Sequence, residues 1–261
     1  MQCSTSFDFH TNVFRKLYMR DDIAPFKAMS VRKKANQKIA EGKPVISLAV
    51  GQPGAQLPEA MRNLIVSEGT KGAFGYTDAL GTVALQEKIA SFHNEKYDDH
   101  IEARQVAVTN GASGAFTLAF LACFKPGDRI GIAVPGYPAY RNIIKALGFQ
   151  PVEIRVGEAT RWCLTAELIE EAHKKAPLAG VLVASPANPT GTMLSPQALR
   201  KAVDVCDALG IRFISDEIYH GLSYGMEEKT ARGMSSSVIV INSFSKYFCM
   251  TGWRVGWMVL P

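Results

Sequence analysis

The sequence predicts an α/β fold with a mostly parallel, seven-stranded sheet and helices on both of its faces. Three observations lead to this prediction. From about residue 105, short β-rich runs alternate with longer helical stretches, which is the order that builds parallel sheets. The central runs are almost continuously apolar, as strands covered on both faces are. The lengths of the runs, and the Gly and Pro residues beside them, favour strands over buried helices.

The expected elements follow one another along residues 105–260. The β-rich runs are residues 105–109, 129–134, 151–156, 179–185, 211–215, 238–242 and 254–260. The helical stretches between the first five runs are residues 113–124, 140–147, 165–176 and 195–210. The last of these has the clearest boundaries, because Ser195 can cap it, Pro196 suits its first position and Gly210 can end it. Its expected buried stripe consists of Leu199, Ala202, Val203 and Cys206.

The first hundred residues have a different pattern. They contain two helical stretches and two loop-rich segments, which are residues 30–41, 82–97, 50–60 and 72–82. The basic cluster at residues 31–38 is interpreted as the solvated face of the first helix, with Val31, Ala35 and Ile39 on the other face. A nucleic-acid surface is the less favoured interpretation, because no interleaved aromatic residues or known motif accompany the cluster.

Composition and charge narrow the possible function. Hydrophobic residues make up 47% and charged residues 20% of the 261 residues, which predicts a packed globular core. The net charge of +5 is spread along the chain and suits small anionic ligands. The five cysteines lack metal-ligand spacing, so we interpret them as free thiols of a reducing compartment and expect no metal site. The longest apolar run, residues 114–124, is too short to cross a bilayer, and the N-terminus lacks the pattern of a signal peptide. We therefore expect a cytoplasmic protein that binds neither membranes nor nucleic acid.

Polar residues follow the expected strands at the points where those strands end. In α/β sheets, ligands bind beyond the carboxyl ends of the strands, so these residues are candidates for a site. They are Gly111–Ser113 after the first run, Tyr137 after the second, Asn188 after the fourth, Asp216 and Tyr219 after the fifth, and Ser243, Ser245 and Lys246 after the sixth. Each has a simpler interpretation by itself: a tight turn, a packing aromatic residue, a helix cap or a surface lysine.

A single ligand accounts for all of these positions together. It would be anionic at one end, because Arg254 and the backbone N–H groups at a helix start attract anions. It would be flat, so that it stacks on Tyr137. It would offer a basic ring atom to Asp216, an acceptor oxygen to Asn188, and a group that reacts with the amine of Lys246. This description fits pyridoxal 5′-phosphate (PLP).

Three segments resemble the signature segments of the class I/II aminotransferases, which are PLP enzymes of fold type I. They are "SFSKYFCMTGWRVGW" (residues 243–257), "SPANPTGTMLS" (residues 185–195) and "ISDEIYHGL" (residues 214–222). The first is the most specific, because a serine precedes its lysine by three residues and an arginine follows by eight. The other two arrive in the family's order, and the resemblance extends from about Pro25 to Pro261.

The resemblance implies catalytic roles for three residues. Lys246 would form the Schiff base with PLP and then move a proton between substrate and cofactor. Asp216 would keep the pyridine nitrogen protonated, so that the ring accepts electrons. Tyr219 and Asn188 would hold the ring 3′-oxygen, and Asn188 would also contact the substrate. A cis peptide bond between Asn188 and Pro189 is implied as well, since it aims the Asn188 amide at the ring.

The resemblance also implies the remaining contacts of the site. Tyr137 would stack on the cofactor ring, and the backbone of Gly51 would meet the substrate carboxylate. Tyr76 would reach the phosphate of a neighbouring subunit, which implies a homodimer. The phosphate itself would be held by Ala112, Ser113, Ser243, Ser245 and Arg254, whose guanidinium can bind two oxygens.

For the domain organisation, the resemblance implies an N-terminal segment with part of a small domain in residues 1–50, and a PLP-binding large domain in residues 51–261. Members of the family continue beyond the segment that matches the end of this chain. That continuation supplies most of the small domain and an arginine for the substrate carboxylate. We therefore expect a truncated aminotransferase with an incomplete small domain, which binds PLP if it folds but turns over poorly and tends to aggregate.

The predicted function is transfer of an amino group between an amino acid and a 2-oxo acid through the Lys246 Schiff base. Two alternatives share its key residues. One is a carbon–sulfur β-lyase or ring-forming synthase on the same scaffold, and the other is a PLP-binding remnant without turnover. A nucleotide-binding oxidoreductase is disfavoured, because no G-x-G-x-x-G follows the first β-rich run. The sequence does not identify the amino donor or acceptor.

Overall fold

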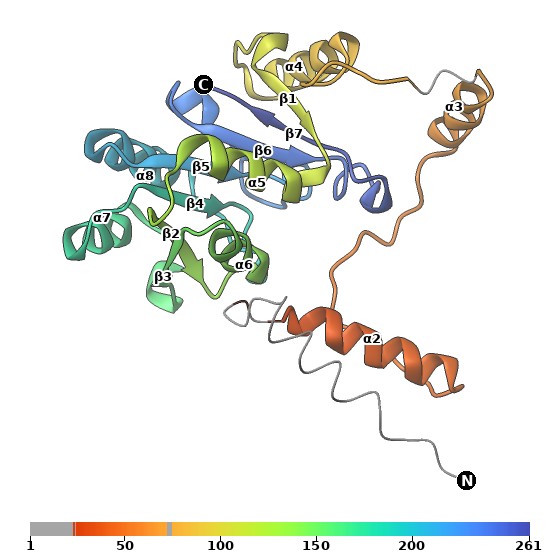
Figure 1. Cartoon of the computed structure of the whole chain (residues 1–261), viewed down its shortest axis with the longest axis horizontal. Helices are drawn as coiled ribbons and strands as arrows, with labels where there is room; N and C mark the ends of the chain where they lie inside the picture. Colours follow the sequence, from red (N-terminus) through yellow and green to blue (C-terminus); the bar gives the residue numbers. More distant parts are fainter. Residues whose placement is uncertain (1–22, 24, 72–74) are drawn as a thin grey trace. The chain divides into compact units, whose positions relative to one another are not determined.

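The computed structural model describes residues 23, 25–71 and 75–261 (Figure 1). The chain divides into two compact units, Met1–Ala49 and Val50–Pro261. The described part of the first unit contains helix α2 (Lys27–Ala40). Of the three residues predicted on the apolar face of this helix, Ala35 is buried, whereas Val31 and Ile39 are exposed. The assignment of residues 1–50 to part of a small domain stays a prediction.

The second unit is built on a seven-stranded sheet with the order β1-β7-β6-β5-β4-β2-β3. Strands β2 to β6 pair in parallel, and β7 pairs antiparallel with both β1 and β6, so the predicted mostly parallel sheet is confirmed. Each strand falls on one of the predicted β-rich runs. The strands are β1 (Val106–Thr109), β2 (Arg129–Val134), β3 (Gln150–Arg155), β4 (Gly180–Ala184), β5 (Arg212–Asp216), β6 (Ile239–Ser243) and β7 (Gly256–Val259).

Helices cover both faces of this sheet, as the apolar strands predict (Figure 1). The α-helices of this unit are α3 (Glu59–Gly69), α4 (Val83–Tyr97), α5 (Gly111–Cys123), α6 (Pro138–Ala146), α7 (Ala166–Lys175) and α8 (Pro196–Leu209). Short 3-10 turns are η1 (Ala103–Gln105), η2 (Glu158–Thr160), η3 (Arg232–Met234) and η4 (Thr251–Trp253). Side chains alternate along β4: Val181 and Val183 join the core cluster with α4, α7 and α8, and Leu182 joins the cluster with α5 and α6.

Helix α8 has the boundaries that the sequence predicts. The Ser195 hydroxyl accepts a hydrogen bond from the Ala198 backbone N–H at 3.2 Å, and Pro196 is the first helical residue. Gly210 ends the helix with φ +66°, a left-handed conformation that glycine adopts without a steric penalty. The predicted stripe is confirmed, because Leu199, Ala202, Val203 and Cys206 are the buried residues of the helix.

Helix α3 was not predicted. Its first residues lie at the end of a segment interpreted as loop, since four of the nine residues 50–58 are Gly or Pro. The helix begins directly after Pro58 and carries Met61, Leu64 and Ile65, a spacing of three and four residues that is typical of one helical face. That spacing is the signal from which it could have been found.

The start of helix α5 packs directly on strands β6 and β7. A Cβ atom at Gly256 would lie 2.7 Å from the carbonyl carbon of Gly111 and 2.9 Å from the amide nitrogen of Ala112. It would also lie 2.9 Å from the carbonyl oxygen of Asn242. Side-chain rotation cannot relieve contacts with backbone atoms, so only glycine at position 256 lets the helix start lie this close to the sheet.

We predict that Gly256→Ala lowers the free energy of unfolding by about 1–3 kcal/mol, the usual cost of overpacking a core. The matched control is Gly233→Ala, since a Cβ at Gly233 meets no atom within 4 Å. The control should change the free energy of unfolding by less than about 0.5 kcal/mol. Urea unfolding of both variants measures the difference. Equal stability of the two variants would show that the helix start tolerates a shift.

Candidate active site

The carboxyl ends of four strands bring the predicted residues to one edge of the sheet. Strands β4, β5 and β6 are parallel, and β1 runs in the same direction because both β1 and β6 are antiparallel to β7. The segments that leave these strands are the start of α5, the loop 185–189, the turn 216–221 and the segment 243–246. Figure 1 shows these strand ends in the second unit.

The first feature of this edge is a concentration of positive charge at the start of α5. The Asn110 side chain makes no capping hydrogen bond, so the first N–H groups of the helix have no side-chain partner there. Gly111 has φ +72°, and a Cβ on it would lie 2.5 Å from Nη2 of Arg254. The exposed Arg254 guanidinium, which donates to the Thr251 carbonyl at 3.0 Å, therefore lies against the positive end of a helix dipole. An anion bound there would meet both.

Two buried serines lie on the neighbouring strand end. Ser243 is the last residue of β6, and its hydroxyl oxygen accepts a hydrogen bond from the Ser245 backbone N–H at 3.1 Å. Both serines are nearly inaccessible to solvent. In the first turn of α5, Ala112 is buried and Ser113 is exposed. The predicted phosphate-binding set thus consists of small or hydroxyl-bearing residues, together with one arginine.

Lys246 is half-buried and its amine is held in place. Its Nζ donates a hydrogen bond to the Gly51 carbonyl at 3.0 Å and lies 5.7 Å from the centroid of the Tyr219 ring. Burial lowers the pKa of Lys246, the positive charge of Arg254 lowers it further, and the negative charge of Asp216 opposes both. A lowered pKa increases the fraction of neutral amine, which is the nucleophilic form.

The segment that carries Lys246 packs on the turn that carries Tyr219. Gly221 has φ +94°, and the space that a Cβ would need is filled by the ring of Tyr247. The Lys96 amine lies 5.8 Å from that ring and 3.0 Å from a carboxylate oxygen of Glu228. Glu228 in turn accepts the Gly221 N–H, with nitrogen–oxygen distances of 2.6 and 2.9 Å. These contacts fix the position of the residue next to Lys246.

Asp216 is a buried carboxylate at the end of β5. One oxygen accepts the Ile218 backbone N–H at 3.1 Å, and the other accepts a hydrogen bond from the Tyr140 hydroxyl. Burial raises the pKa of Asp216 to about 6, although the hydrogen bonds from Tyr140 and Ile218 oppose the increase. Burial and the neighbouring carboxylate raise the pKa of Tyr140 well above its ordinary value, so its hydroxyl stays protonated and donates.

Asn188 and Tyr219 meet beside Asp216. The Asn188 side-chain amide donates to the Tyr219 hydroxyl oxygen at 3.4 Å, which is the long end of the hydrogen-bond range. The predicted cis peptide bond between Asn188 and Pro189 is confirmed. Two more cis bonds, Val134–Pro135 and Ser185–Pro186, lie in the same group of loops and were not predicted.

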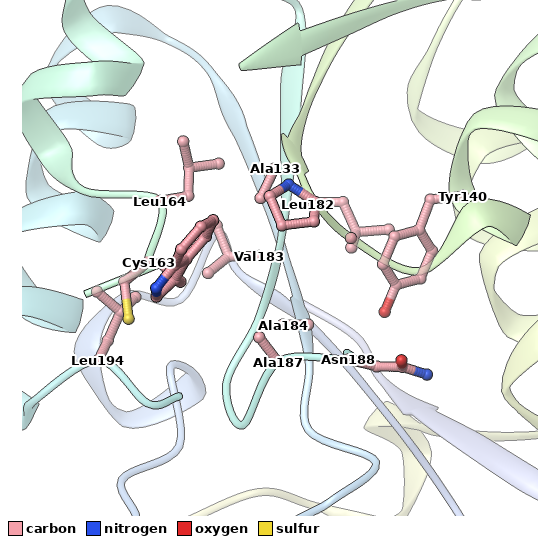
Figure 2. A pocket seen from close by; sticks show the side chains of 13 residues that line it. Ala133, Tyr140, Cys163, Leu164, Leu182, Val183, Ala184, Ala187, Asn188 and Leu194 are labelled. Carbon is pink, nitrogen blue, oxygen red and sulfur yellow. The ribbon is translucent and has the colours of Figure 1, made fainter. Parts of the chain in front are cut away.

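A small cavity lies next to these groups (Figure 2). Tyr140 and Asn188 line it on one side, and its remaining wall is mostly apolar, with Ala184, Ala187 and Leu194 among the lining residues. Its volume of about 20 Å³ is enough for roughly one water molecule. Tyr137 is half-buried nearby, and its ring meets the Tyr140 ring edge-on with centroids 5.3 Å apart.

Two predicted site residues have a different setting from the rest. Tyr76 is fully exposed, and the structure shows no hydrogen bond between it and another described residue. Gly51 is exposed, and its carbonyl accepts the Lys246 amine. The predicted contact of Gly51 with a substrate stays a prediction, as does the contact of Tyr76 with a second subunit.

Tyr140 was missed by the sequence analysis. It stands one turn after Tyr137 on helix α6, and the sequence alone shows only a generic aromatic residue. Its partner Asp216 is 76 residues away, so no local pattern connects them. Tyr137 directly precedes helix α6 and Tyr140 lies in its first turn, and this spacing of three residues is the local signal for a shared face.

Residues 23, 25–71 and 75–261 contain no group of three or more His, Cys, Asp or Glu side chains placed to hold a metal ion. In the same residues, no helix is both long enough and apolar enough to cross a bilayer. The four described cysteines, Cys123, Cys163, Cys206 and Cys249, are free thiols, as predicted.

Comparison with known proteins now decides the family. The family model described as "Aminotransferase class I and II" matches residues 43–261. The chain belongs to this family. Among curated class I and II relatives, the valine–pyruvate aminotransferase of Mycobacterium tuberculosis is 43% identical over 248 residues, covering 94% of this chain and 63% of the relative. An aspartate aminotransferase of Sulfurisphaera tokodaii is 33% identical, covering 82% and 55%.

Solved structures of aminotransferases agree with this family assignment. An aminotransferase from Mycobacterium tuberculosis superposes with a TM-score of 0.89 at 43% identity, covering 93% of this chain and 63% of that one. The aspartate aminotransferase of Thermotoga maritima gives 0.85 at 32% identity, covering 92% and 64%. The chain therefore spans about three fifths of the length of these relatives.

We predict that Asp216→Asn stabilises the ligand-free chain at neutral pH. In the folded chain the pKa of Asp216 is raised from 3.8 to about 6, so ionising this carboxyl destabilises the fold as the pH rises through that range. The variant should gain up to roughly 3 kcal/mol of unfolding free energy at pH 7.5, and the gain should vanish near pH 4.

Denaturant unfolding between pH 4 and pH 7.5 measures this effect. The control is Asp78→Asn, because Asp78 is exposed. The control should change the free energy of unfolding by less than about 0.5 kcal/mol at pH 7.5. A pH-independent effect of Asp216→Asn would mean that the buried carboxyl does not titrate in this range.

Proposed function

We propose that this chain holds the PLP site of an aminotransferase that moves an amino group between an amino acid and a 2-oxo acid. The observation that supports this most directly is that a half-buried lysine and a buried carboxylate lie at the same edge of the sheet, close enough for the charge of each to shift the pKa of the other. Family membership supports it independently, because aminotransferases of this class use PLP. The whole enzyme's activity is part of the proposal, since the chain spans 63% of its valine–pyruvate relative.

The residues at the strand ends fit the three polar parts of PLP. The phosphate suits the uncapped start of α5 with Arg254, because both offer donors to one anion. The pyridine nitrogen suits Asp216, a carboxylate that lies out of water and therefore gains from a neighbouring cation. The ring 3′-oxygen suits Asn188 and Tyr219, whose polar atoms already meet.

When bound, PLP supplies an aldehyde for the lysine amine and a ring that withdraws electrons from the substrate's α-carbon. The protein's own residues do the remaining work. Lys246 would hold the cofactor through its amine and, once released by the substrate, would accept and return the proton at the substrate's α-carbon as a general base and acid. Asp216 would keep a proton on the ring nitrogen, and Tyr137 would lie beside the ring and limit its motion. The backbone of Gly51 is proposed to meet the substrate carboxylate.

The proposal also covers partners. A homodimer is proposed, in which Tyr76 reaches the neighbouring subunit. Such a residue would be exposed in a single chain, and Tyr76 is fully exposed. Valine and pyruvate form the first substrate pair to test, since the relative that carries those names is 43% identical to this chain.

We predict that borohydride reduction of the PLP-treated chain places the cofactor on Lys246, because this amine is held at the site with a lowered pKa. Peptide mapping by mass spectrometry locates the label, and Lys246→Ala is the control that should lose it. Addition of valine to unreduced protein should convert bound PLP to its amine form, and pyruvate should restore it. Label on another lysine contradicts the site, and release of ammonia without the amine form indicates a lyase instead.

We predict that Arg254→Lys raises the dissociation constant for PLP by about 10-fold to 100-fold. Lysine keeps the charge but cannot offer two parallel donors to the phosphate, and a charge-assisted hydrogen bond contributes about 1.5–3 kcal/mol. Fluorescence titration with PLP measures the constant, and pyridoxal without phosphate should bind both proteins alike. The control is Arg104→Lys, an exposed arginine that pairs with Glu102. Unchanged PLP affinity in Arg254→Lys would remove Arg254 from the phosphate site.

A further inference from the structure

A buried polar network lies behind the turn that carries Asp216 and Tyr219. Its centre is His220, which is 5% exposed. The His220 Nδ1 atom lies 2.6 Å from the Tyr97 hydroxyl at the end of α4, and Nε2 lies 3.0 Å from the Ser185 carbonyl oxygen. None of these three residues belongs to the proposed cofactor contacts, and nothing said above about the reaction uses them.

The partners of His220 determine its tautomer. A carbonyl oxygen only accepts, so the bond to Ser185 requires the proton on Nε2. In a neutral ring Nδ1 is then the acceptor, and the Tyr97 hydroxyl donates to it. Burial and the charges of Glu217 and Glu228 raise the pKa of Tyr97, so its hydroxyl keeps the proton that this arrangement needs.

The buried side chain of Glu217 lies beside the ring. One of its oxygens accepts from the Ser215 hydroxyl at 2.9 Å and from the Ala231 N–H at 2.9 Å. The other oxygen has no hydrogen-bond partner among the described residues and lies 3.5 Å from His220 Nδ1. The histidine is therefore held on one side by the Tyr97 hydroxyl, with its Nε2 donor directed to the other side.

Ser185 is the first residue of the loop that carries Asn188. Its backbone N–H donates to the Asp216 carbonyl at 3.3 Å, and its hydroxyl accepts the Leu194 N–H at 3.1 Å. The bond from His220 engages its remaining polar group, the carbonyl. Because Pro186 follows directly, a shift of this carbonyl moves the start of the loop.

Three hydrogen bonds among the described residues join the turn 216–221 to this loop, and the bond from His220 is the shortest of them, because the bond from the Ser185 N–H to the Asp216 carbonyl is 3.3 Å long. The side chains of Asn188 and Tyr219 are 3.4 Å apart, so their own hydrogen bond is weak. The bond from His220 to Ser185 is 3.0 Å long and shielded from water, and it joins the same two segments. In a buried setting such a bond is stronger than an exposed one.

We propose that His220 is a positioning residue: its Nε2–H holds the loop 185–189, and with it the Asn188 amide, against the turn that carries Tyr219. Its link to the cofactor rests on the proposed function, whereas its hold on the loop does not. His220 acts through Ser185 and touches neither cofactor nor substrate.

Two substitutions at His220 separate this role from general packing. In His220→Gln the side-chain nitrogen reaches the position of Nε2 and can still donate to Ser185. In His220→Asn the side chain is too short for that bond but still fills the space near Tyr97. The control is His93→Gln, because His93 is buried in the same network through Thr230 and makes no bond to the loop.

The first measurement is hydrogen–deuterium exchange of loop 185–189 in the cofactor-free chain. His220→Asn should increase the exchange rate of its amides several-fold, while His220→Gln and His93→Gln should leave it near that of the unaltered chain. The second is the dissociation constant for PLP, together with the pH at which the absorbance of bound PLP changes. His220→Asn should raise the dissociation constant for PLP several-fold and shift the pH of the absorbance change. His220→Gln should leave both close to the values of the unaltered chain.

Equal behaviour of His220→Asn and His220→Gln in loop exchange would overturn the proposal, as would unchanged loop exchange in His220→Asn. If the unaltered chain binds no PLP, the proposed function fails, but the exchange comparison still decides whether His220 holds the loop. Thermal unfolding of each variant accompanies both measurements. A loss of stability shared by His93→Gln and His220→Asn, without the loop effect, would assign His220 to packing alone.

Discussion

Burial of the Asp216 carboxylate is the constraint around which the rest of the site is arranged. A carboxylate at the end of a central strand lies out of water, so the chain must supply hydrogen bonds from the protein. Tyr140 from helix α6 and the Ile218 N–H provide them, and burial still raises the pKa of the acid to about 6. The raised pKa shows that the negative charge of Asp216 is not fully stabilised by these hydrogen bonds. A neighbouring cation would stabilise it, and the protonated pyridine nitrogen of the proposed cofactor is such a cation. Tyr219 lies in the turn that follows this strand end. Asn188 lies in the loop that follows the neighbouring strand β4.

The parallel sheet explains why the sequence predicts so much of this site. Candidate site residues follow five of the seven apolar runs, and in a parallel sheet the carboxyl ends of the strands lie at one edge. This rule alone predicts that Asn188, Asp216 and Lys246 lie at one site, without any information about contacts between them. The boundaries of α8 could also be predicted from local sequence, since the Ser195 cap and the left-handed Gly210 depend only on residues within the helix or next to it. Helix α3 was lost because the Gly and Pro residues before it outweighed its short apolar spacing.

The residues that support the site depend on contacts that no local pattern contains. Tyr140 meets a partner 76 residues away, and His220 meets partners 123 and 35 residues away. A tyrosine on a helix and a histidine after a tyrosine are ordinary in sequence, and only the fold brings them to the buried side of the turn. Sequence reasoning therefore finds groups that would touch a ligand at strand ends, because their position in the chain marks them. It misses those that hold these groups from behind.

Gly111, Gly221 and Gly256 share a property that bears on how this site tolerates change. At each of them the place of a Cβ atom is already taken, by the Arg254 guanidinium, by the Tyr247 ring, or by the backbone at the start of α5. At these positions the neighbouring atoms already lie at contact distance, so an added Cβ atom would push the two packed segments apart. A larger residue at Gly221 would move the turn 216–221 away from the segment that carries Lys246. A larger residue at Gly256 would move the start of helix α5 away from the sheet. Gly221 and Gly256 thus determine how closely the parts of the site approach one another, although neither contributes a side chain to it.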